Sequence, residues 1–272
     1  MIRHIINIIL LSILLSNVVV KNTFSQERKV YDRLSGFSNW SLVAGPVLYK
    51  KAEIRPQYGN LTFKNKPILG FNAGILYGFN SDKMWSFQTG TLLAMEPTYS
   101  FAYEIQKYDL FDSYQGNLTD SYKSYAFYSL SFPLLLSLNL QTSKNTFASL
   151  LIGSKIMYFP YGQSEYVYTV IDEELSESRE IFGLKLESQK NAFQGSFVLG
   201  TGFSYALQKI LLKANLIYVF NLQNTITGEY QFANLFVSAD TRGDYNLSGN
   251  YLGLLLSISF NKFKKEEIFW YN

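Results

Sequence analysis

Hydrophobic and small polar residues alternate with a period of two along several segments of the chain. Residues 67–79, PILGFNAGILYGF, show this clearly, because large apolar side chains take every second position and Gly or Asn fill most places between. A strand sends successive side chains to opposite faces, whereas a helix would scatter them around its axis. The pattern therefore predicts strands, and it returns in residues 124–140, 148–158, 193–207, 210–221 and 252–260.

Two less regular segments, residues 40–50 and 84–94, complete a set of eight predicted strands. The connections alternate in length, with short turns at 80–83, 141–146 and 208–209. An even strand number, with short turns on one side and long loops on the other, is typical of outer-membrane barrels with periplasmic termini. The predicted long loops are polar and Tyr-rich, and they cover residues 51–66, 96–123, 159–190 and 223–246.

The chemistry of the two strand faces distinguishes a membrane barrel from a soluble β fold. In a soluble sandwich or lipocalin-like barrel, the face opposite the apolar core carries Lys and Glu. Here that face is Gly, Ser and Asn, and charge is nearly absent from the strand interiors. We therefore predict an all-β fold, an antiparallel up-and-down transmembrane β-barrel of about eight strands. A soluble β fold is the alternative.

The N-terminus has the layout of a secretory signal peptide. Arg3 precedes an apolar run from Ile5 to Val20, and the small residues Thr23 and Ser25 take the −3 and −1 positions of a cleavage site. The alternative is a membrane anchor, but the run is shorter than the about 20 apolar residues that span a bilayer. The predicted parts are a cleaved signal peptide (1–25), a periplasmic segment (26–37), the barrel (38–263) and a periplasmic tail (264–272).

The composition argues against several classes of catalytic, metal-binding and nucleic-acid-binding protein. The chain has no Cys, and its only His is His4, inside the predicted signal peptide. Ser–His hydrolysis and the usual zinc sites are therefore not expected, and we predict a protein without enzymatic activity, cofactor or metal. The net charge of +3, from 24 basic and 21 acidic residues, is too weak to indicate nucleic-acid binding.

Charged residues gather in the predicted outer loops. A basic cluster is a candidate for lipopolysaccharide contact, since anionic head groups attract Lys and Arg, and ordinary loop solubility is the alternative. The acidic cluster is interpreted as a solvated loop, with a divalent-cation site as a hypothesis. Arg242, Gly243 and Asp244 form a tripeptide that some adhesins present. Three common residues are only weak support for a role in adhesion. The basic cluster is Lys50, Lys51, Arg55, Lys64 and Lys66, and the acidic cluster is Asp172, Glu173, Glu174, Glu177 and Glu180.

Polar residues on the inward strand face are candidates for filling the barrel. An eight-stranded barrel is just wide enough inside for its own side chains. We therefore predict a hydrogen-bonded plug in the lumen rather than a wide pore. The candidates are Asn72, Gln88, Lys155, Gln194, Lys213 and Asn215.

Residues 38–263 resemble the small eight-stranded outer-membrane barrels of the OmpA/OmpX type, and among them the PorT-like barrels without a second domain. Tyr251, Gly253, Leu256 and Ile258 in YLGLLLSI resemble the C-terminal signal that the barrel-assembly machinery reads. The sequence departs from that signal because Tyr251 is only partly polar and a tail follows the last strand.

The resemblance implies a location in the outer membrane of a Gram-negative bacterium, in contact with lipid and lipopolysaccharide. It also implies a structural or accessory role, with secretion-system subunits as partners. Two alternatives stay open. The barrel could be a narrow channel for ions or small solutes, or its long outer loops could recognise other surfaces.

Overall fold

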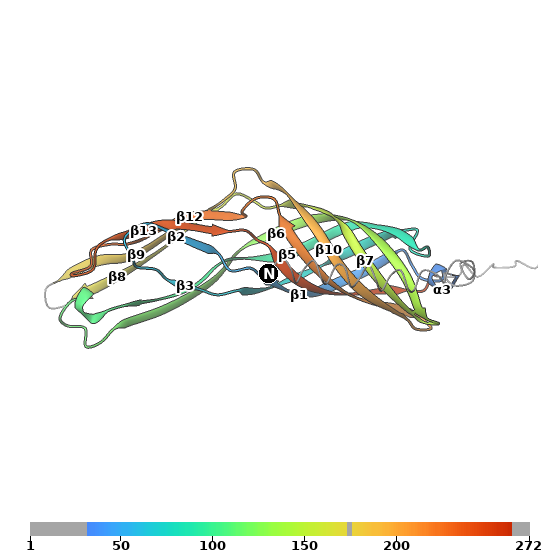
Figure 1. Cartoon of the computed structure of the whole chain (residues 1–272), viewed down its shortest axis with the longest axis horizontal. Helices are drawn as coiled ribbons and strands as arrows, with labels where there is room; N and C mark the ends of the chain where they lie inside the picture. Colours follow the sequence, from blue (N-terminus) through green and yellow to red (C-terminus); the bar gives the residue numbers. More distant parts are fainter. Residues whose placement is uncertain (1–31, 173–175, 263–272) are drawn as a thin grey trace, which may run out of the picture.

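The computed structural model describes residues 32–172 and 176–262 and contains a closed antiparallel barrel (Figure 1). Eight strands pair in chain order, and the last pairs with the first, as in Leu48 opposite Leu252. This confirms the predicted up-and-down barrel. Its strands are β1 (Trp40–Tyr49), β4 (Ile68–Phe79), β5 (Trp85–Ile105), β6 (Leu118–Ser143), β7 (Thr146–Tyr158), β10 (Phe193–Ala206), β11 (Ile210–Asn221) and β14 (Tyr251–Phe260).

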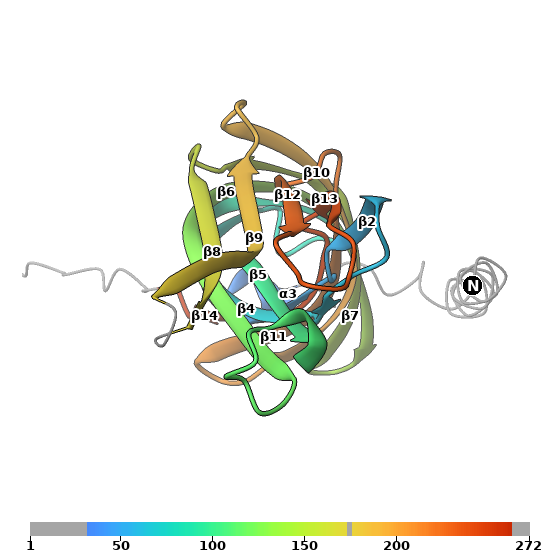
Figure 2. The same cartoon turned by 90° about the vertical axis from the view of Figure 1, so that its left-hand side faces the viewer.

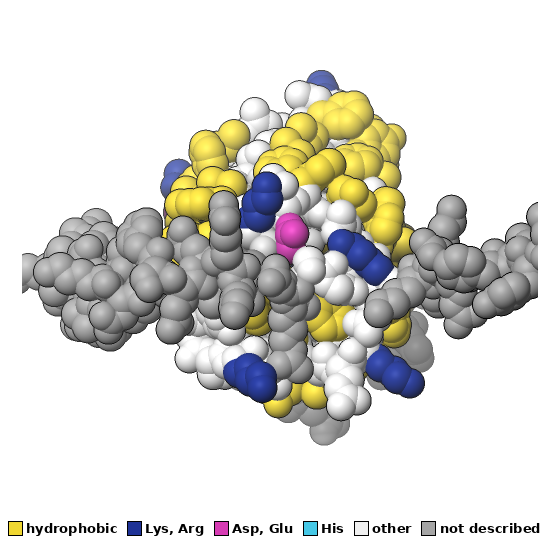
Figure 3. All heavy atoms as spheres, turned by 90° about the vertical axis from the view of Figure 1, so that its right-hand side faces the viewer, with side chains coloured by type: hydrophobic (Ala, Val, Ile, Leu, Met, Phe, Trp, Pro, Cys, Tyr) yellow, Lys and Arg dark blue, Asp and Glu magenta, His cyan; other side chains and the backbone are white. Residues whose placement is uncertain are grey.

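The barrel wall is apolar outside and largely polar inside, as the alternation predicted. Leu134 and Leu136 are exposed on the outer surface, whereas Ser137, directly after Leu136, is buried. Figure 3, which views the end where the described chain begins, shows hydrophobic side chains on the wall. An outward apolar band of this kind is the surface that a bilayer covers. No helix among the described residues is long and apolar enough to cross a membrane.

The long outer connections are not loops, and that prediction was wrong. β5 and β6 continue as a paired hairpin beyond Leu130, where β6 stops pairing with β7. A second sheet stands beside this hairpin, in the order β2-β13-β12-β9-β8 (Figures 1 and 2). Its strands are β2 (Glu53–Tyr58), β8 (Gln163–Asp172), β9 (Glu177–Ser188), β12 (Ile226–Phe232) and β13 (Thr241–Leu247), and β3 (Lys64–Asn65) pairs with β5.

This outer extension, meaning the second sheet, β3 and the outer hairpin, has its own hydrophobic core. Phe182 is buried at its centre, and its ring centroid lies 4.6 Å from Tyr103 and 4.9 Å from Phe232. Phe63 contacts Phe101 and Phe182 edge-on. Burial of apolar surface is the main force that stabilises a fold, so the extension is a folded unit outside the membrane.

The chain before β1 covers the mouth of the barrel at the end where the short turns lie. The short helix α3 (Asp32–Ser35) places Leu34 beside Phe37, and both are buried against Phe147, Ala206 and Leu211. The part of the predicted periplasmic segment that the structure describes is thus a cap. The predicted signal peptide and the tail lie outside the described residues.

Candidate functional site

The six predicted plug residues lie in the lumen but do not form one network. Asn72 and Lys155 meet at Tyr251, whose hydroxyl accepts hydrogen bonds from Asn72 Nδ2 at 3.2 Å and from Lys155 Nζ at 3.4 Å. Gln88 and Lys213 line a separate cavity of about 10 Å³ beside the cap residues Leu34 and Phe37, room for about one water molecule. Gln194 and Asn215 are also buried.

An apolar layer, which the sequence did not indicate, crosses the lumen. Each of the eight barrel strands sends at least one buried hydrophobic side chain into it. Side chains packed together in this way fill much of the lumen at this level. The main contributors, in chain order, are Val43, Val47, Leu76, Leu92, Leu135, Leu151, Val198, Ile217 and Leu255.

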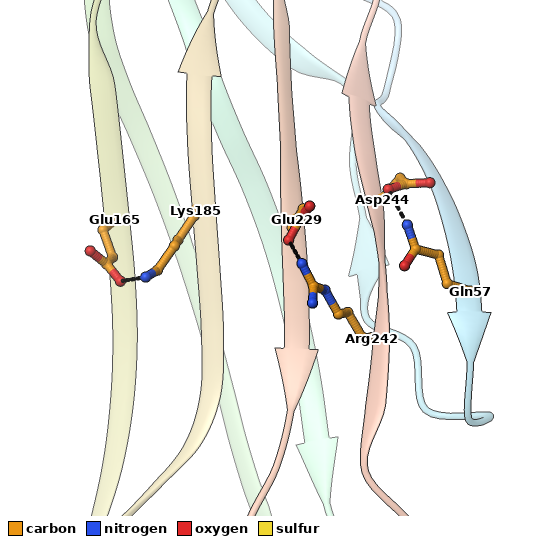
Figure 4. Close-up of polar contacts among 6 residues, drawn as sticks. All are labelled: Gln57, Glu165, Lys185, Glu229, Arg242 and Asp244. Carbon is orange, nitrogen blue, oxygen red and sulfur yellow. Dashed lines mark hydrogen bonds and ion pairs between the residues drawn. The ribbon is translucent and has the colours of Figure 1, made fainter.

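The outer face of the second sheet carries paired charges (Figure 4). Glu165 and Lys185 form an ion pair of 3.0 Å across β8 and β9, and Arg242 of β13 pairs with Glu229 of β12. The hydrogen bond to Glu229 raises the pKa of Arg242 further above its ordinary value. This face therefore meets water with its charges compensated.

The tripeptide of Arg242, Gly243 and Asp244 lies inside strand β13, so its assignment to a loop was wrong. Asp244 accepts a hydrogen bond of 2.8 Å from Gln57 Nε2, while Arg242 is engaged by Glu229. A Cβ atom added to Gly243 would lie 2.5 Å from the carbonyl oxygen of Arg55. The tripeptide is part of the sheet and does not project as an adhesive loop would.

Two of the three described members of the acidic cluster bind neighbouring side chains. Asp172 is buried and accepts a hydrogen bond of 3.3 Å from Ser113 Oγ, and Glu177 pairs with Arg179 at 3.5 Å. Glu180 lies in β9, and Glu173 and Glu174 fall outside the described residues. Among the described residues, no group of His, Cys, Asp and Glu is arranged to hold a metal ion.

Tyr103 of the outer hairpin and Tyr166 of β8 share the carboxylate of Asp120, which lies in β6 of the hairpin. Tyr166 Oη donates to Asp120 Oδ2 at 2.9 Å, and Tyr103 Oη approaches the same oxygen at 3.4 Å. Burial, with the hydrogen bond to Asp120, raises the pKa of Tyr166 to about 12. Burial likewise raises the pKa of Tyr103 far above its ordinary value. Both phenols therefore stay neutral and donate hydrogen bonds. The cluster connects the outer hairpin to β8 of the second sheet.

The distal tip of the extension, defined as Tyr108, Phe236 and Val237, exposes apolar side chains on a fixed backbone. The 3-10 turn η1 (Lys107–Asp109) ends in Asp109, which is buried. Its carboxylate accepts hydrogen bonds from the backbone N–H of Val237 at 3.0 Å and of Ser238 at 2.6 Å. Phe236 and Val237 are nevertheless 49% and 70% exposed. No periodic pattern of residues indicates this arrangement.

The basic residues and the predicted assembly signal lie in different parts of the chain. Lys50, Lys51, Lys64 and Lys66 are exposed near the outer rim of the barrel, but Arg55 lies in β2 and pairs with Glu53 at 2.9 Å. In β14, Leu256 and Ile258 face outward opposite Ala44 and Leu42 of β1, at the junction that closes the barrel, whereas Tyr251 and Gly253 face inward.

No family model and no curated protein matches the chain. Among solved structures, the outer membrane protein OprG from Pseudomonas aeruginosa is similar, with 10% identity, a TM-score of 0.39 and coverage of 83% of this chain and 98% of that one. The outer membrane protease OmpT from Escherichia coli is 10% identical, with a TM-score of 0.30, and the matched regions cover 82% and 95% of the two chains. The toluene transporter TodX from P. putida is 7% identical, with a TM-score of 0.27 and coverages of 88% and 94%. Similarities at this level support no conclusion about the function of this chain.

Proposed function

We propose that this protein is a non-enzymatic, non-conducting outer-membrane barrel that anchors a folded extension outside the cell for contact with another protein. The observation that carries the proposal is the apolar layer to which all eight strands contribute. A lumen filled in this way favours an anchor over a channel, because ions need a hydrated path. The predicted secretion-complex role is one form of such an accessory function.

The distal tip is the part of the extension best suited to protein contact. Exposed aromatic and aliphatic residues that sit together are typical of protein-binding surfaces. Asp109 fixes the backbone beneath Val237, so little conformational freedom would be lost on binding. The guanidinium of Arg179 lies 4.4 Å from the ring centroid of Phe236, which places a cation beside the apolar residues. Tip-mediated contact therefore combines a rigid backbone with residue types that contribute most to binding.

The tip can be tested by capture from native outer membranes. The double substitution Phe236→Ser with Val237→Ser should reduce recovery of cross-linked partners at least about tenfold, as expected when an interface loses two central apolar side chains. Quantitative mass spectrometry of the captured proteins gives the readout. The matched control, Tyr161→Ser with Val167→Ser, alters two exposed apolar residues nearer the barrel and should leave recovery unchanged.

Planar-bilayer recordings of the wild-type barrel separate this role from transport. The closed lumen should give no discrete conductance steps. Regular steps would contradict the anchor role and favour the channel alternative. Equal loss of partners in the tip and control variants would remove the tip from the proposal.

A further inference from the structure

Lysines from distant parts of the sequence meet above the outer rim of the barrel. In β3, Lys64 pairs with Ala102 of β5, and the backbone N–H of Lys66 donates to the carbonyl of Ser100 at 3.2 Å. On the opposite edge of β5, Ser100 pairs with Lys123 of β6. β5 therefore lies between Lys64 and Lys66 on one side and Lys123 of β6 on the other.

These lysine side chains share the outer face of the extension. Phe101 is 2% exposed and points into the extension core, so the residues before and after it point outward. Lys66, Ser100 and Lys123 consequently form a row across neighbouring strands on the outward side. Lys64 lies in the neighbouring row, beside Ala102. The side chains of Lys64, Lys66 and Lys123 are all exposed.

The row provides space for an anion between ammonium groups. Neighbouring strands lie about 4.8 Å apart, so the Cα atoms of Lys66 and Lys123 are separated by about 10 Å. Only the small side chain of Ser100 stands between them, and its hydroxyl is a further donor. None of the ion pairs formed by the described residues involves Lys64 or Lys66.

Lys50 and Lys51 add positive charge nearer the membrane. Leu48 is the last lipid-facing residue of β1, and Lys50 follows two positions later, directly beyond the apolar band. Asn65 Nδ2 donates to the carbonyl of Ala52 at 2.7 Å, which ties this segment to β3. The rim patch, defined as Lys50, Lys51, Lys64, Lys66 and Lys123, thus extends outward from the level of the head groups.

We propose that the rim patch binds the phosphorylated head group of lipopolysaccharide in the outer leaflet. The patch starts where the apolar band ends and continues along strands that leave the membrane, so it matches a tall anionic head group rather than a compact one. Arg55 does not belong to it, because β2 lies in the second sheet and Glu53 pairs with this arginine. Lys123 does belong to it, although it lies far from the other lysines in sequence.

The test compares two triple variants of the full barrel in detergent. The first is Lys64→Gln, Lys66→Gln and Lys123→Gln, and native mass spectrometry measures binding of bisphosphorylated lipid A and of lipopolysaccharide. Each lysine near an anionic surface contributes about fivefold, so affinity for lipopolysaccharide should fall about 100-fold. The control removes the same charge from the short periplasmic turns, by substituting Lys83, Lys144 and Lys209 with Gln, and should bind within about twofold of wild type.

Three outcomes would overturn the proposal: equal weakening in both variants, undiminished binding of dephosphorylated lipid A, or equal binding of phosphatidylglycerol vesicles. Inorganic phosphate alone should compete only weakly, since it cannot reach both levels of the patch. Unchanged heat-dependent gel mobility shows that each variant folds. If the triple variant does not fold, the single substitution Lys66→Gln should still weaken binding about fivefold, and an unchanged affinity would contradict the proposal.

Discussion

The substitution Phe182→Ala should lower the free energy of unfolding of the outer extension by about 3–5 kcal/mol, the usual cost of truncating a buried aromatic residue to Ala. Phe182 is 1% exposed, and its ring lies 4.6 Å from Tyr103 and 5.7 Å from Phe63 between centroids. Its removal leaves a cavity at the contact between the outer hairpin and the second sheet. The extension should therefore become sensitive to protease while the barrel remains folded.

Urea titration in lipid vesicles, followed by pulse proteolysis of the extension, measures this loss. Heat-dependent gel mobility reports on the barrel in the same samples. Val167→Ala is the matched control, because Val167 lies opposite Gly183 on the neighbouring strand and is 41% exposed. Its effect should be below about 0.5 kcal/mol. An extension that is no less stable with Phe182→Ala than with Val167→Ala would contradict the presence of a separate core.

The substitution Leu199→Arg should destabilise the barrel itself, by about 2–4 kcal/mol, the cost of a basic residue on the lipid face near the bilayer midplane. Leu199 lies in the middle of β10, opposite Ile152 and Tyr218 of the two neighbouring strands, and is 56% exposed. Urea unfolding in vesicles, monitored by tryptophan fluorescence, gives the difference from wild type. A guanidinium at this position would face hydrocarbon without a partner.

Leu207→Arg is the control for membrane depth. Leu207 is also an exposed leucine, but it lies beyond the end of β10, in the short turn before β11. Near the interface an arginine costs about 0–1 kcal/mol. If the two substitutions cost the same, the wall of the barrel does not face a bilayer. If Leu207→Arg is the more damaging, the assignment of membrane depth is wrong.

The barrel could be predicted because its two faces differ in chemistry along most strands. Lipid requires large apolar side chains outside, and the narrow lumen accepts Gly, Ser and Asn, so period-two alternation is visible in segments such as residues 67–79. The extension was not predicted because different kinds of residue alternate in its strands. Its outer face meets water and carries Glu229 and Arg242, while Tyr230 and Tyr245 fill its core. Strands such as ITGEYQF therefore resemble polar loops.

The apolar layer of the lumen and the rim patch could not be predicted, because both depend on how the strands pair. A single sequence does not show this pairing. Leu76 and Leu135 each lie in an apolar run, where inward and outward positions look alike, so the layer across the lumen was not predicted. Lys123 and Lys66 are brought to opposite sides of Ser100 by the continuation of β5 and β6 beyond the barrel. Arg55 was grouped with the lysines by sequence proximity alone.

Amide hydrogen exchange of the barrel in lipid vesicles tests most directly whether the outer connections form a folded extension. β12 lies between β9 and β13, so its amides take part in ladders on both sides. These amides should exchange at least about 1,000-fold more slowly than those of the turn at residues 189–191, because only opening of the sheet exposes them. Exchange of the β12 amides at the rate of the turn would show that this segment is a loop and would contradict the account.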